Sequence, residues 1–452
     1  MAEQSRAKFE RAELARVQAV LNGRFPHKML PDLTRMTTLV DLLGHPEQAY
    51  PTIHLTGTNG KTSTARMIDT LLRAFGLRTG RYTSPHLEKV TERISIDGRP
   101  ASSEVFVQAY DDVADFVAMV DAQSKEQVTF FELLTAMAFS AFADTPIEVG
   151  VIEVGMGGTW DATNVIDSLV QVITPISLDH RELGDTLAEV ATEKAGILRA
   201  GGTAILSSQP KEAAAVLLRK AAELEMIVAR EGLEFGVADR RLALGGQLLS
   251  LRGLGGEYGE LFLPLHGAHQ AHNAAAALAA VEAFLGAGED GPLDIDSVRV
   301  GFAAMDSPGR LETIRSSPTI ILDGAHNPAG AKALASALAE DFAFDRLVGV
   351  VAILSDKDVG AILAALEPVL SSIVVTQSSS PRAMTIDELA NEAVEIFGGD
   401  RVEVEPRLDD AIDAAVRMAE DDTPLGGSGV IITGSLVTVG EARGLLTQGR
   451  RT

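Results

Sequence analysis

The chain has 452 residues, of which 46% are hydrophobic and 23% are charged. This length predicts two domains, and the composition is typical of a folded globular protein. The formal net charge of −24 argues against nucleic acid and anionic membrane surfaces as partners, because both would repel the chain. The chain has no cysteine, which excludes disulfides, thiolate metal ligands and thiol catalysis.

The sequence shows no targeting or membrane segment. Residues 1–18 are charged throughout and lack the apolar stretch of a signal peptide. No apolar run approaches the roughly 18–20 residues that a membrane-spanning helix needs. We therefore expect a cytoplasmic protein.

Apolar spacing predicts helices in the first 50 residues, then a strand at Thr52–Leu55 and a helix from about Thr62 to Phe75. Further along, buried parallel strands are expected at residues 149–154, 170–176 and 203–206, with helical stretches at 130–142 and 186–198. Residues 227–265 are rich in glycine and in short alternating segments, which predicts antiparallel hairpins.

The alternation of strands and helices restarts near residues 303–308. Strand-like runs follow at residues 319–322, 347–354, 373–376 and 430–433, with helical stretches between them. We therefore predict an α/β protein with two domains, residues 1–305 and residues 306–452, of which the second is an open α/β domain.

A phosphate-binding loop is predicted where the first strand meets its helix, in the segment HLTGTNGKTS that begins at His54. Backbone N–H groups at a helix N-terminus attract anions, and glycines let the backbone approach phosphate closely. The strict phosphate-loop pattern would have a glycine at Leu55, so only its Gly-Lys-Thr end is present. The predicted ATP contacts are Gly57, Thr58, Asn59, Gly60, Lys61 and Thr62.

Within that loop, Lys61 is placed to contact the β- and γ-phosphates, and the Thr62 hydroxyl is placed to reach Mg²⁺. The alternative is an ordinary turn before a helix. A lysine at a helix start opposes the helix dipole unless an anion is present, which favours the nucleotide site.

With TGTNGKTS and the segments around it, the chain resembles the Mur ligase superfamily and, within it, folylpolyglutamate synthase/dihydrofolate synthase. The segments that carry the resemblance, in the family's order, are PDLTRMTTLVDLLG, YTSPHL, TFFELLTA, IEVGMGGTWDATNVI, SLDH, EKAGI, HQAHNAAAA, SPGRLE and ILDGAHNP. The resemblance implies an N-terminal P-loop (Mur-ligase-like) ATPase domain, a C-terminal Rossmann-like domain and ATP between them. Muramyl ligases usually carry a UDP-binding domain first, and about 55 residues before the loop are too few for one.

The resemblance also implies a set of site residues. Ser84, Glu153 and His180 match magnesium positions. Lys194 matches a carbamylated lysine that serves catalysis, and His326 is expected to be a further catalytic residue. Asn273, Arg310 and Asp323 match nucleotide contacts. The residues expected to bind the pterin acid are Leu30, Pro31, Asp32, Leu33, Thr129, Phe130, Phe131, Glu132, Trp160, Asp161 and Ala162.

Without the resemblance, several of these residues have plainer interpretations. Glu153 closes an apolar strand, where ligands of open α/β sheets gather, but a strand-end acid is often only a surface group. A lone histidine such as His180 or a helix lysine such as Lys194 is more often structural. One of Phe130 and Phe131 must be buried in the core against which the helix packs. The sequence departs from the family in a shortened segment after His180 and in Thr159-Trp160, where the family often has Arg-Leu.

A charged loop lies between Thr83 and Ile94. It contains His86, Glu88, Lys89 and Arg93. The loop either contacts an anionic substrate or is merely solvated. The residues alone leave both readings open.

The resemblance implies ATP-dependent addition of L-glutamate to folates, and also to dihydropteroate, through an acyl phosphate. It implies Mg²⁺, a monovalent cation such as K⁺, and a monomer. Three alternatives stay open: a muramyl-type or other amide ligase, a phosphate-loop kinase or GTPase switch, and an ATP-binding module without catalysis.

Overall fold

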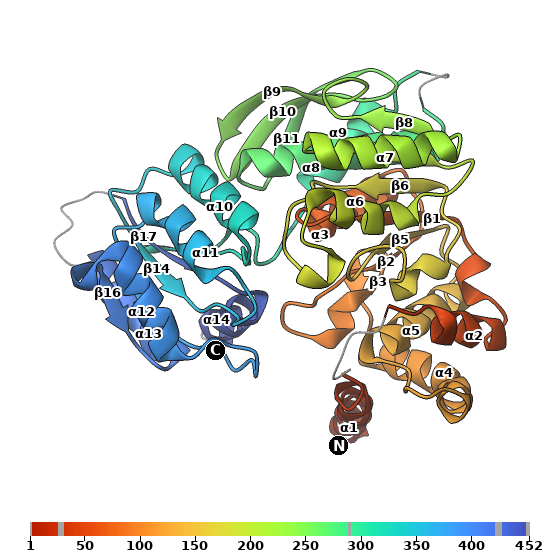
Figure 1. Ribbon diagram of the computed structural model, residues 1–452, viewed down its shortest axis with the longest axis horizontal. Coiled ribbons are helices and arrows are strands. Elements are labelled where there is room, and N and C mark those ends of the chain that lie inside the picture. The colour runs from red at the N-terminus through yellow and green to blue at the C-terminus, as the bar shows by residue number, and fades with distance from the viewer. Residues whose placement is uncertain (1, 26–30, 288–290, 421–426, 449–452) are drawn as a thin grey trace. The chain divides into compact units, whose positions relative to one another are not determined.

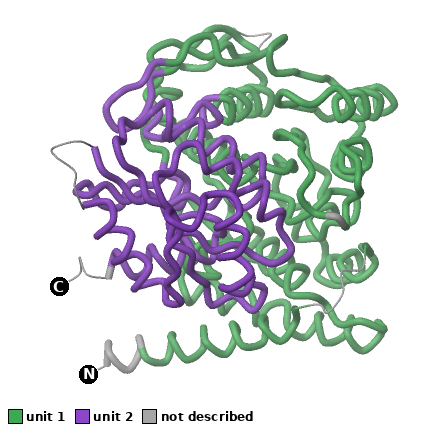
Figure 2. Tube along the Cα trace, turned by 60° about the vertical axis from the view of Figure 1, so that its left-hand side comes forward, with its two compact units in different colours: residues 1–240, 249–262, 272–305 green, residues 241–248, 263–271, 306–452 purple. Residues whose placement is uncertain are grey.

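The computed structural model describes residues 2–25, 31–287, 291–420 and 427–448. The chain forms two compact units (Figure 2). The first consists of residues 1–240, 249–262 and 272–305, and the second of residues 241–248, 263–271 and 306–452. Two short segments before residue 306 therefore belong to the second unit.

An eight-stranded sheet forms the centre of the first unit (Figure 1). Its strand order is β4-β3-β2-β5-β1-β6-β7-β8, and all neighbours from β2 to β8 are parallel, whereas β3 and β4 pair antiparallel at the edge. The strands are β1 (Thr52–Thr56), β2 (Thr79–Tyr82), β3 (Ile94–Ile96), β4 (Arg99–Pro100), β5 (Val149–Glu153), β6 (Val170–Ile173), β7 (Thr203–Leu206) and β8 (Ile227–Arg230). All of β1 and β5 is buried, as expected of parallel strands with both faces covered.

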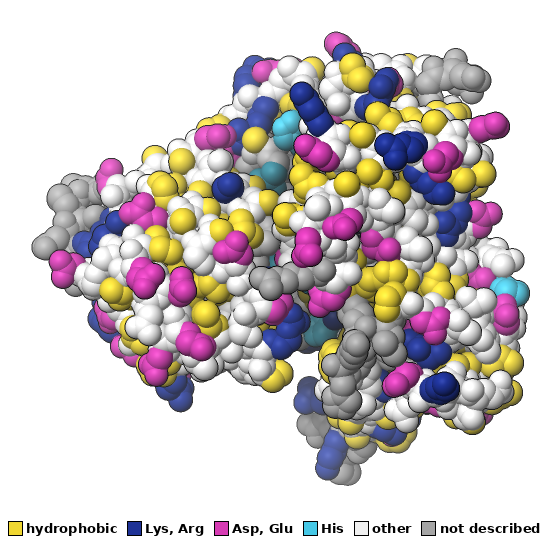
Figure 3. Space-filling model, viewed as in Figure 1, with side chains coloured by type: hydrophobic (Ala, Val, Ile, Leu, Met, Phe, Trp, Pro, Cys, Tyr) yellow, Lys and Arg dark blue, Asp and Glu magenta, His cyan; other side chains and the backbone are white. Residues whose placement is uncertain are grey.

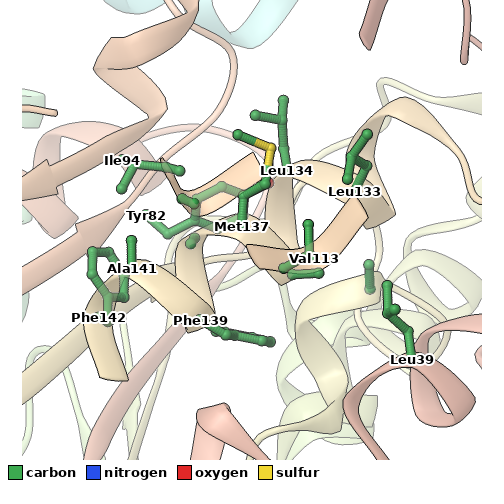
Figure 4. Packing of buried hydrophobic residues seen from close by; sticks show 14 of the residues in the cluster. Leu39, Tyr82, Ile94, Val113, Leu133, Leu134, Met137, Phe139, Ala141 and Phe142 are labelled. Atoms are coloured by element: carbon green, nitrogen blue, oxygen red, sulfur yellow. The ribbon is translucent and has the colours of Figure 1, made fainter. Parts of the chain in front are cut away.

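Helices enclose this sheet. They are α1 (Ala2–Asn22), α2 (Thr34–Leu42), α3 (Lys61–Ala74), α4 (Ser103–Gln123), α5 (Phe130–Asp144), α6 (Leu187–Lys194), α7 (Lys211–Glu223), α8 (Ala268–Leu285, whose first turn belongs to the second unit) and α9 (Ile295–Ala303). Side chains of α2, α4, α5, β2 and β3 share one hydrophobic core. In Figure 4, Tyr82 of β2, Ile94 of β3 and Met137 of α5 lie close together in that core.

A separate three-stranded sheet has the order β11-β10-β9. Its strands are β9 (Gly236–Ala243), β10 (Gly246–Arg252) and β11 (Glu257–Leu263). Only Leu244 and Gly245 join β9 to β10, a connection short enough for a hairpin and too short for a parallel crossover. The expectation of hairpins throughout residues 227–265 is wrong at its start, because β8 extends the large sheet parallel to β7.

The second unit contains a six-stranded sheet of order β12-β13-β17-β14-β15-β16. All neighbours are parallel except β12 and β13. The strands are β12 (Glu312–Ser316), β13 (Thr319–Leu322), β14 (Arg346–Val351), β15 (Ser372–Val375), β16 (Val402–Val404) and β17 (Ser428–Thr433), and the helices are α10 (Pro328–Asp341), α11 (Val359–Leu366), α12 (Ile386–Phe397), α13 (Leu408–Glu420) and α14 (Leu436–Gln448). The predicted α/β fold class is confirmed.

The helix expected over residues 186–198 is shorter than predicted. It ends at Lys194 and is followed by a 3₁₀ turn, Ala195–Ile197. At Gly196 the backbone packs so tightly on Thr159 that a Cβ there would collide with it, so this segment is shaped by packing as well as by local propensity.

On the face that Figure 3 shows, acidic, basic and hydrophobic side chains are interspersed. No helix in the described part of the chain combines the length and the apolar character needed to cross a bilayer.

Candidate active site

The loop between β1 and α3 is held in a conformation that requires glycine. Gly57 has φ +147° and Gly60 has φ +88°. A Cβ on Gly57 would collide with Thr174, and one on Gly60 would lie 2.5 Å from Oδ1 of Asn273. The predicted need for glycine at both positions is therefore met, and Asn273 is packed directly on the loop.

The segment after β6 anchors the loop from the other side. The backbone N–H of Thr58 donates to the carbonyl of Pro175 over 3.0 Å, and the Thr58 hydroxyl donates to the carbonyl of Ser177 over 2.9 Å. Sequence reasoning missed Thr174, Pro175 and Ser177. The available signal was their position directly after an apolar strand, because the carboxyl ends of parallel strands meet at one edge of a sheet.

Two lysines converge on one carbonyl of the loop. Nζ of Lys61 donates to the carbonyl of Gly57 over 3.0 Å, and Nζ of Lys194 donates to the same oxygen over 2.8 Å. Lys194 is 3% exposed, and burial, followed by the charge of Lys61, lowers its pKa to about 7. The structure thus brings the predicted catalytic lysine Lys194 to the phosphate loop, and at neutral pH much of its amine is uncharged.

Glu153 contacts two other residues predicted for the metal site. It ends β5 with 1% exposure, and its carboxylate accepts hydrogen bonds from the Thr62 hydroxyl over 2.8 Å and from the backbone N–H of Ser84 over 3.1 Å. Carboxylate and hydroxyl oxygens are the ligands that Mg²⁺ prefers, and Mg²⁺ is commonly held by one or two of them together with substrate phosphates. The donor set therefore suits magnesium bound with a nucleotide.

His180 has a different neighbour. Its Nε2 lies 3.6 Å from Oδ2 of Asp179, and its side chain is 37% exposed. Across the described ranges, no three or more His, Cys, Asp or Glu side chains are arranged so that they could hold a metal ion by themselves. The contacts at hand thus place Ser84 and Glu153 at the phosphate loop, and place His180 beside Asp179.

The N-terminus of α5 carries four residues predicted to bind the pterin acid. Two of them, Thr129 and Glu132, make hydrogen bonds within the protein. The Thr129 hydroxyl caps the helix by accepting from the Glu132 N–H, and the Glu132 carboxylate accepts in return from the Thr129 N–H over 2.7 Å. The Glu132 carboxylate also receives two hydrogen bonds from the Arg35 guanidinium, at 2.9 and 3.1 Å. Thr129 and Glu132 therefore hold α5 against α2.

The two phenylalanines of α5 differ in environment. Phe130 is 6% exposed, and its ring stacks on Phe25 with centroids 4.3 Å apart. Phe131 is half-buried, lies 5.8 Å from the ring of Tyr82, and closes over Gly155 so tightly that a Cβ there would lie 2.5 Å from the ring. The core claims Phe130, and Phe131 keeps part of its surface accessible.

Asp161 is satisfied within its own loop. It is 4% exposed and accepts from the Thr163 hydroxyl and N–H and from the Met156 N–H, while burial raises its pKa. Ala162 begins the 3₁₀ turn that follows, and the neighbouring Trp160 is half-buried.

The remaining predicted pterin residues precede α2. The Asp32 carboxylate accepts from the N–H of Thr34 over 2.8 Å, Pro31 is exposed, and Leu33 is half-buried. Leu30 lies outside the described residues.

In the second unit, the segment after β13 gathers Arg310, Asp323 and His326. The buried Asp323 carboxylate accepts from the N–H groups of Leu311 and Ala325, at 3.0 and 2.9 Å. Burial raises the pKa of Asp323, and the charge of Arg310 opposes that rise. Nδ1 of His326 lies 2.8 Å from the carbonyl of Gly324.

Asn327 follows this segment and caps α10, as the plain helix-start interpretation expected. Its side-chain oxygen accepts from the Gly330 N–H over 2.8 Å, and Pro328 occupies the first turn. Asp323 thus ends a strand and Asn327 begins a helix, with His326 held between them.

This fold and this loop define a phosphate-loop ligase of the Mur type. The Mur ligase middle domain matches residues 55–281, and the Mur ligase glutamate ligase domain matches residues 309–436. The chain is 52% identical to the dihydrofolate synthase/folylpolyglutamate synthase of Mycobacterium tuberculosis over 96% of this chain and 94% of that protein. The chain belongs to the folylpolyglutamate synthase/dihydrofolate synthase family.

Solved structures agree with this assignment. The M. tuberculosis folylpolyglutamate synthase complexed with ADP and AMPPCP is 53% identical, with a TM-score of 0.92 over 97% of this chain and 99% of that one. A folylpolyglutamate synthase in complex with AMPPCP and folate is 32% identical, with a TM-score of 0.84 over 96% of this chain and 99% of that one.

Proposed function

We propose that the protein uses ATP to add L-glutamate to folates, and also to dihydropteroate. The observation that carries this proposal is the phosphate loop with Lys61, Lys194 and Glu153 gathered around it. Family membership supports it, since the M. tuberculosis relative is named for both activities and a similar structure holds AMPPCP with folate.

The first step activates the carboxylate of the pterin acid. A carboxylate does not acylate an amine at neutral pH, because its oxygen leaves poorly. A carboxylate oxygen instead attacks the γ-phosphorus of ATP, the bond to the bridging oxygen breaks, and ADP leaves with an acyl phosphate remaining. Lys61 neutralises charge on the phosphoryl group in transfer, and the backbone N–H groups at the start of α3 hold the nucleotide phosphates in line.

The second step forms the amide. The neutral amine of glutamate attacks the acyl carbon, the acyl–oxygen bond breaks, phosphate leaves, and the ammonium proton is lost to solvent. Positioning is the protein's main task here, and exclusion of water protects the acyl phosphate from hydrolysis. We assign ATP contacts in this reaction to Asn273, Arg310 and Asp323, and a catalytic contact to His326.

Glu153 and Thr62 would hold Mg²⁺ together with nucleotide phosphates, with Ser84 completing the site and His180 approaching it. When bound, Mg²⁺ polarises phosphoryl oxygens as a Lewis acid. Glu153 itself holds the Thr62 hydroxyl and the Ser84 backbone at the loop by hydrogen bonds.

We assign carbamylation to Lys194. Only an uncharged amine reacts with CO₂, and a buried lysine with a pKa of about 7 supplies that form at neutral pH. The product is an anion at the phosphate loop, which orients cations there.

Small-molecule substrates follow from the family. The acidic composition supports the further inference that neither nucleic acid nor a membrane is a partner. We also propose a cytoplasmic location, because the sequence shows no targeting segment, and a monomer, because the family resemblance implies one.

The test is ADP release by the purified chain with dihydropteroate or tetrahydrofolate, each with and without L-glutamate. Release that requires both the pterin acid and glutamate supports the ligase. Release without glutamate indicates a kinase or a switch, and activity only with a muramyl peptide precursor indicates a muramyl-type ligase. Binding of ATP without any turnover indicates a module without catalysis.

A further inference from the structure

Arg93 is a buried cation that the function described above does not use. It ends the 3₁₀ turn Val90–Arg93 directly before β3, and the whole residue is 8% exposed. Placing a guanidinium in such a site costs free energy unless hydrogen-bond acceptors or negative charge compensate for the lost water. Burial accordingly lowers the pKa of Arg93, yet a guanidinium stays protonated at neutral pH.

Two contacts fix the orientation of this guanidinium. Its Nε donates to Nδ1 of His86 over 2.9 Å, and its central carbon lies 5.1 Å from the centroid of the Phe130 ring. The stacking of Phe25 on Phe130 occupies the other ring face. The Phe130 ring is thus occupied by Phe25 and Arg93. The half-buried Phe131 on the same helix is the phenylalanine that can contact the heterocycle of a ligand.

The two terminal nitrogens of Arg93 differ from its Nε in their contacts. In the part of the chain that the structure describes, Nε is the guanidinium nitrogen with a hydrogen bond, and no carboxylate lies within ion-pair distance of Nη1 or Nη2. Glu153 and Glu92 are near enough for their negative charges to act on the guanidinium. The terminal N–H groups of Arg93 therefore lie near the Glu153 carboxylate, and the contacts with His86 and Phe130 fix their orientation.

We propose that Arg93 binds the carboxylate of the pterin acid that is to be phosphorylated, through Nη1 and Nη2. This inference rests on the proposed function and deepens it. A guanidinium fork matches a carboxylate in shape and charge, and a bound carboxylate can accept one hydrogen bond from each of the two terminal nitrogens. A positive charge is needed there, because an anionic carboxylate must approach an anionic triphosphate before any bond can form.

His86 and Phe130 are positioning residues in this arrangement. They hold the guanidinium in one orientation, so that little side-chain freedom is lost when the carboxylate binds. This role accounts for the charged loop between Thr83 and Ile94, which the sequence left open between a solvated loop and a substrate contact.

The test compares pteroate with its primary amide, which has the same rings but no charge. Affinities are measured by calorimetry in the presence of Mg²⁺ and AMPPCP for the wild type and three variants. Arg93→Met keeps an apolar stem on Phe130 without the charge, and Arg93→Lys restores charge without the fork. Arg99→Met removes an arginine from the exposed strand β4 as a matched control.

We expect the wild type to prefer pteroate over the amide by at least about tenfold. Arg93→Met should weaken pteroate binding by about tenfold to a hundredfold and amide binding by less than about threefold, the range of a charge-assisted hydrogen bond. Arg93→Lys should recover part of the preference, and Arg99→Met should change neither affinity. AMPPCP affinity and thermal unfolding report whether each variant is folded.

A purely structural Arg93 would weaken both ligands by the same factor, and an uninvolved one would weaken neither; both results overturn the inference. If the wild type ligates glutamate but the preference for pteroate survives in Arg93→Met, this inference alone fails. If the wild type shows no glutamate-dependent ADP release, the proposed function fails instead.

Discussion

Two buried glutamates of the first unit, Glu153 and Glu132, show how similar carboxylates take different roles. Glu132 is matched by a buried guanidinium, Arg35, and by the helix end that it caps. Glu153 accepts from the hydroxyl of Thr62 on the phosphate-loop helix and from the backbone of Ser84 on another loop. Glu132 joins two helices, and Glu153 joins the phosphate-loop helix to the loop that contains Ser84. Partners, more than burial, therefore separate a structural carboxylate from a functional one.

The functional side of this comparison is tested most severely at Lys61. Lys61→Ala should lower the turnover of glutamate-dependent ADP release by about a thousandfold, because it removes the cation beside the γ-phosphoryl group. The measurement is steady-state ADP release at saturating substrates. Lys211→Ala removes another lysine that begins a helix, one that is exposed and has no assigned role, and should leave turnover unchanged. Near-normal turnover in Lys61→Ala would contradict the phosphate-loop role.

The structural side is tested by Glu132→Gln. The change leaves the buried Arg35 without its main counter-charge, and among the described residues Asp32, 3.7 Å away and partly exposed, is the acid that remains to compensate. We expect the free energy of unfolding to fall by about 3 kcal/mol, as measured by urea denaturation. Glu126→Gln, at an exposed position just before α5, is the control. A stable Glu132→Gln variant with weakened pteroate binding would instead support the ligand contact predicted from the resemblance.

Glu153→Gln should act on the metal and spare the fold. The Mg²⁺ concentration for half-maximal activity should rise by about tenfold to a hundredfold, because an amide is a far weaker ligand than a carboxylate. Glu148→Gln changes an exposed glutamate just before the opposite end of the same strand and should leave the Mg²⁺ titration unaltered. An unchanged titration in Glu153→Gln would remove the distinction drawn between the two glutamates.

The last prediction concerns Lys194 and pH. Its pKa is about 7 in the folded chain and near 10.5 in the unfolded chain, so between these values the unfolded state binds more protons. The stability of the wild type should therefore rise relative to that of Lys194→Met as the pH increases from 7 toward 10. Denaturant unfolding in bicarbonate-free buffer measures this difference. A pH-independent difference would show that the lysine has an ordinary pKa.

Much of the fold was predictable because several buried parallel strands are continuous apolar runs, as at β14 and β15. The ends of elements were less predictable. β6 ends at Ile173, whereas the sequence predicted Ile176, and β8 joins the large sheet although the strands that follow it in the chain, β9 and β10, form a hairpin. In the site, the glycines of the phosphate loop follow from local chemistry. The pairing of Glu132 with Arg35 and the packing of Thr174 on Gly57 join residues 97 and 117 positions apart, which no local pattern reveals.

By itself the sequence determined the phosphate loop, because backbone N–H groups, glycines and a lysine at a helix start form an anion site from adjacent residues. Tertiary structure alone decided which charged side chains serve that site. Lys194 reaches Gly57 across 137 positions, and the buried Arg93 is oriented by a hydrogen bond from its Nε to His86. Burial and the choice of partner set the charge and availability of such groups, and both depend on chain segments that meet only in the folded protein.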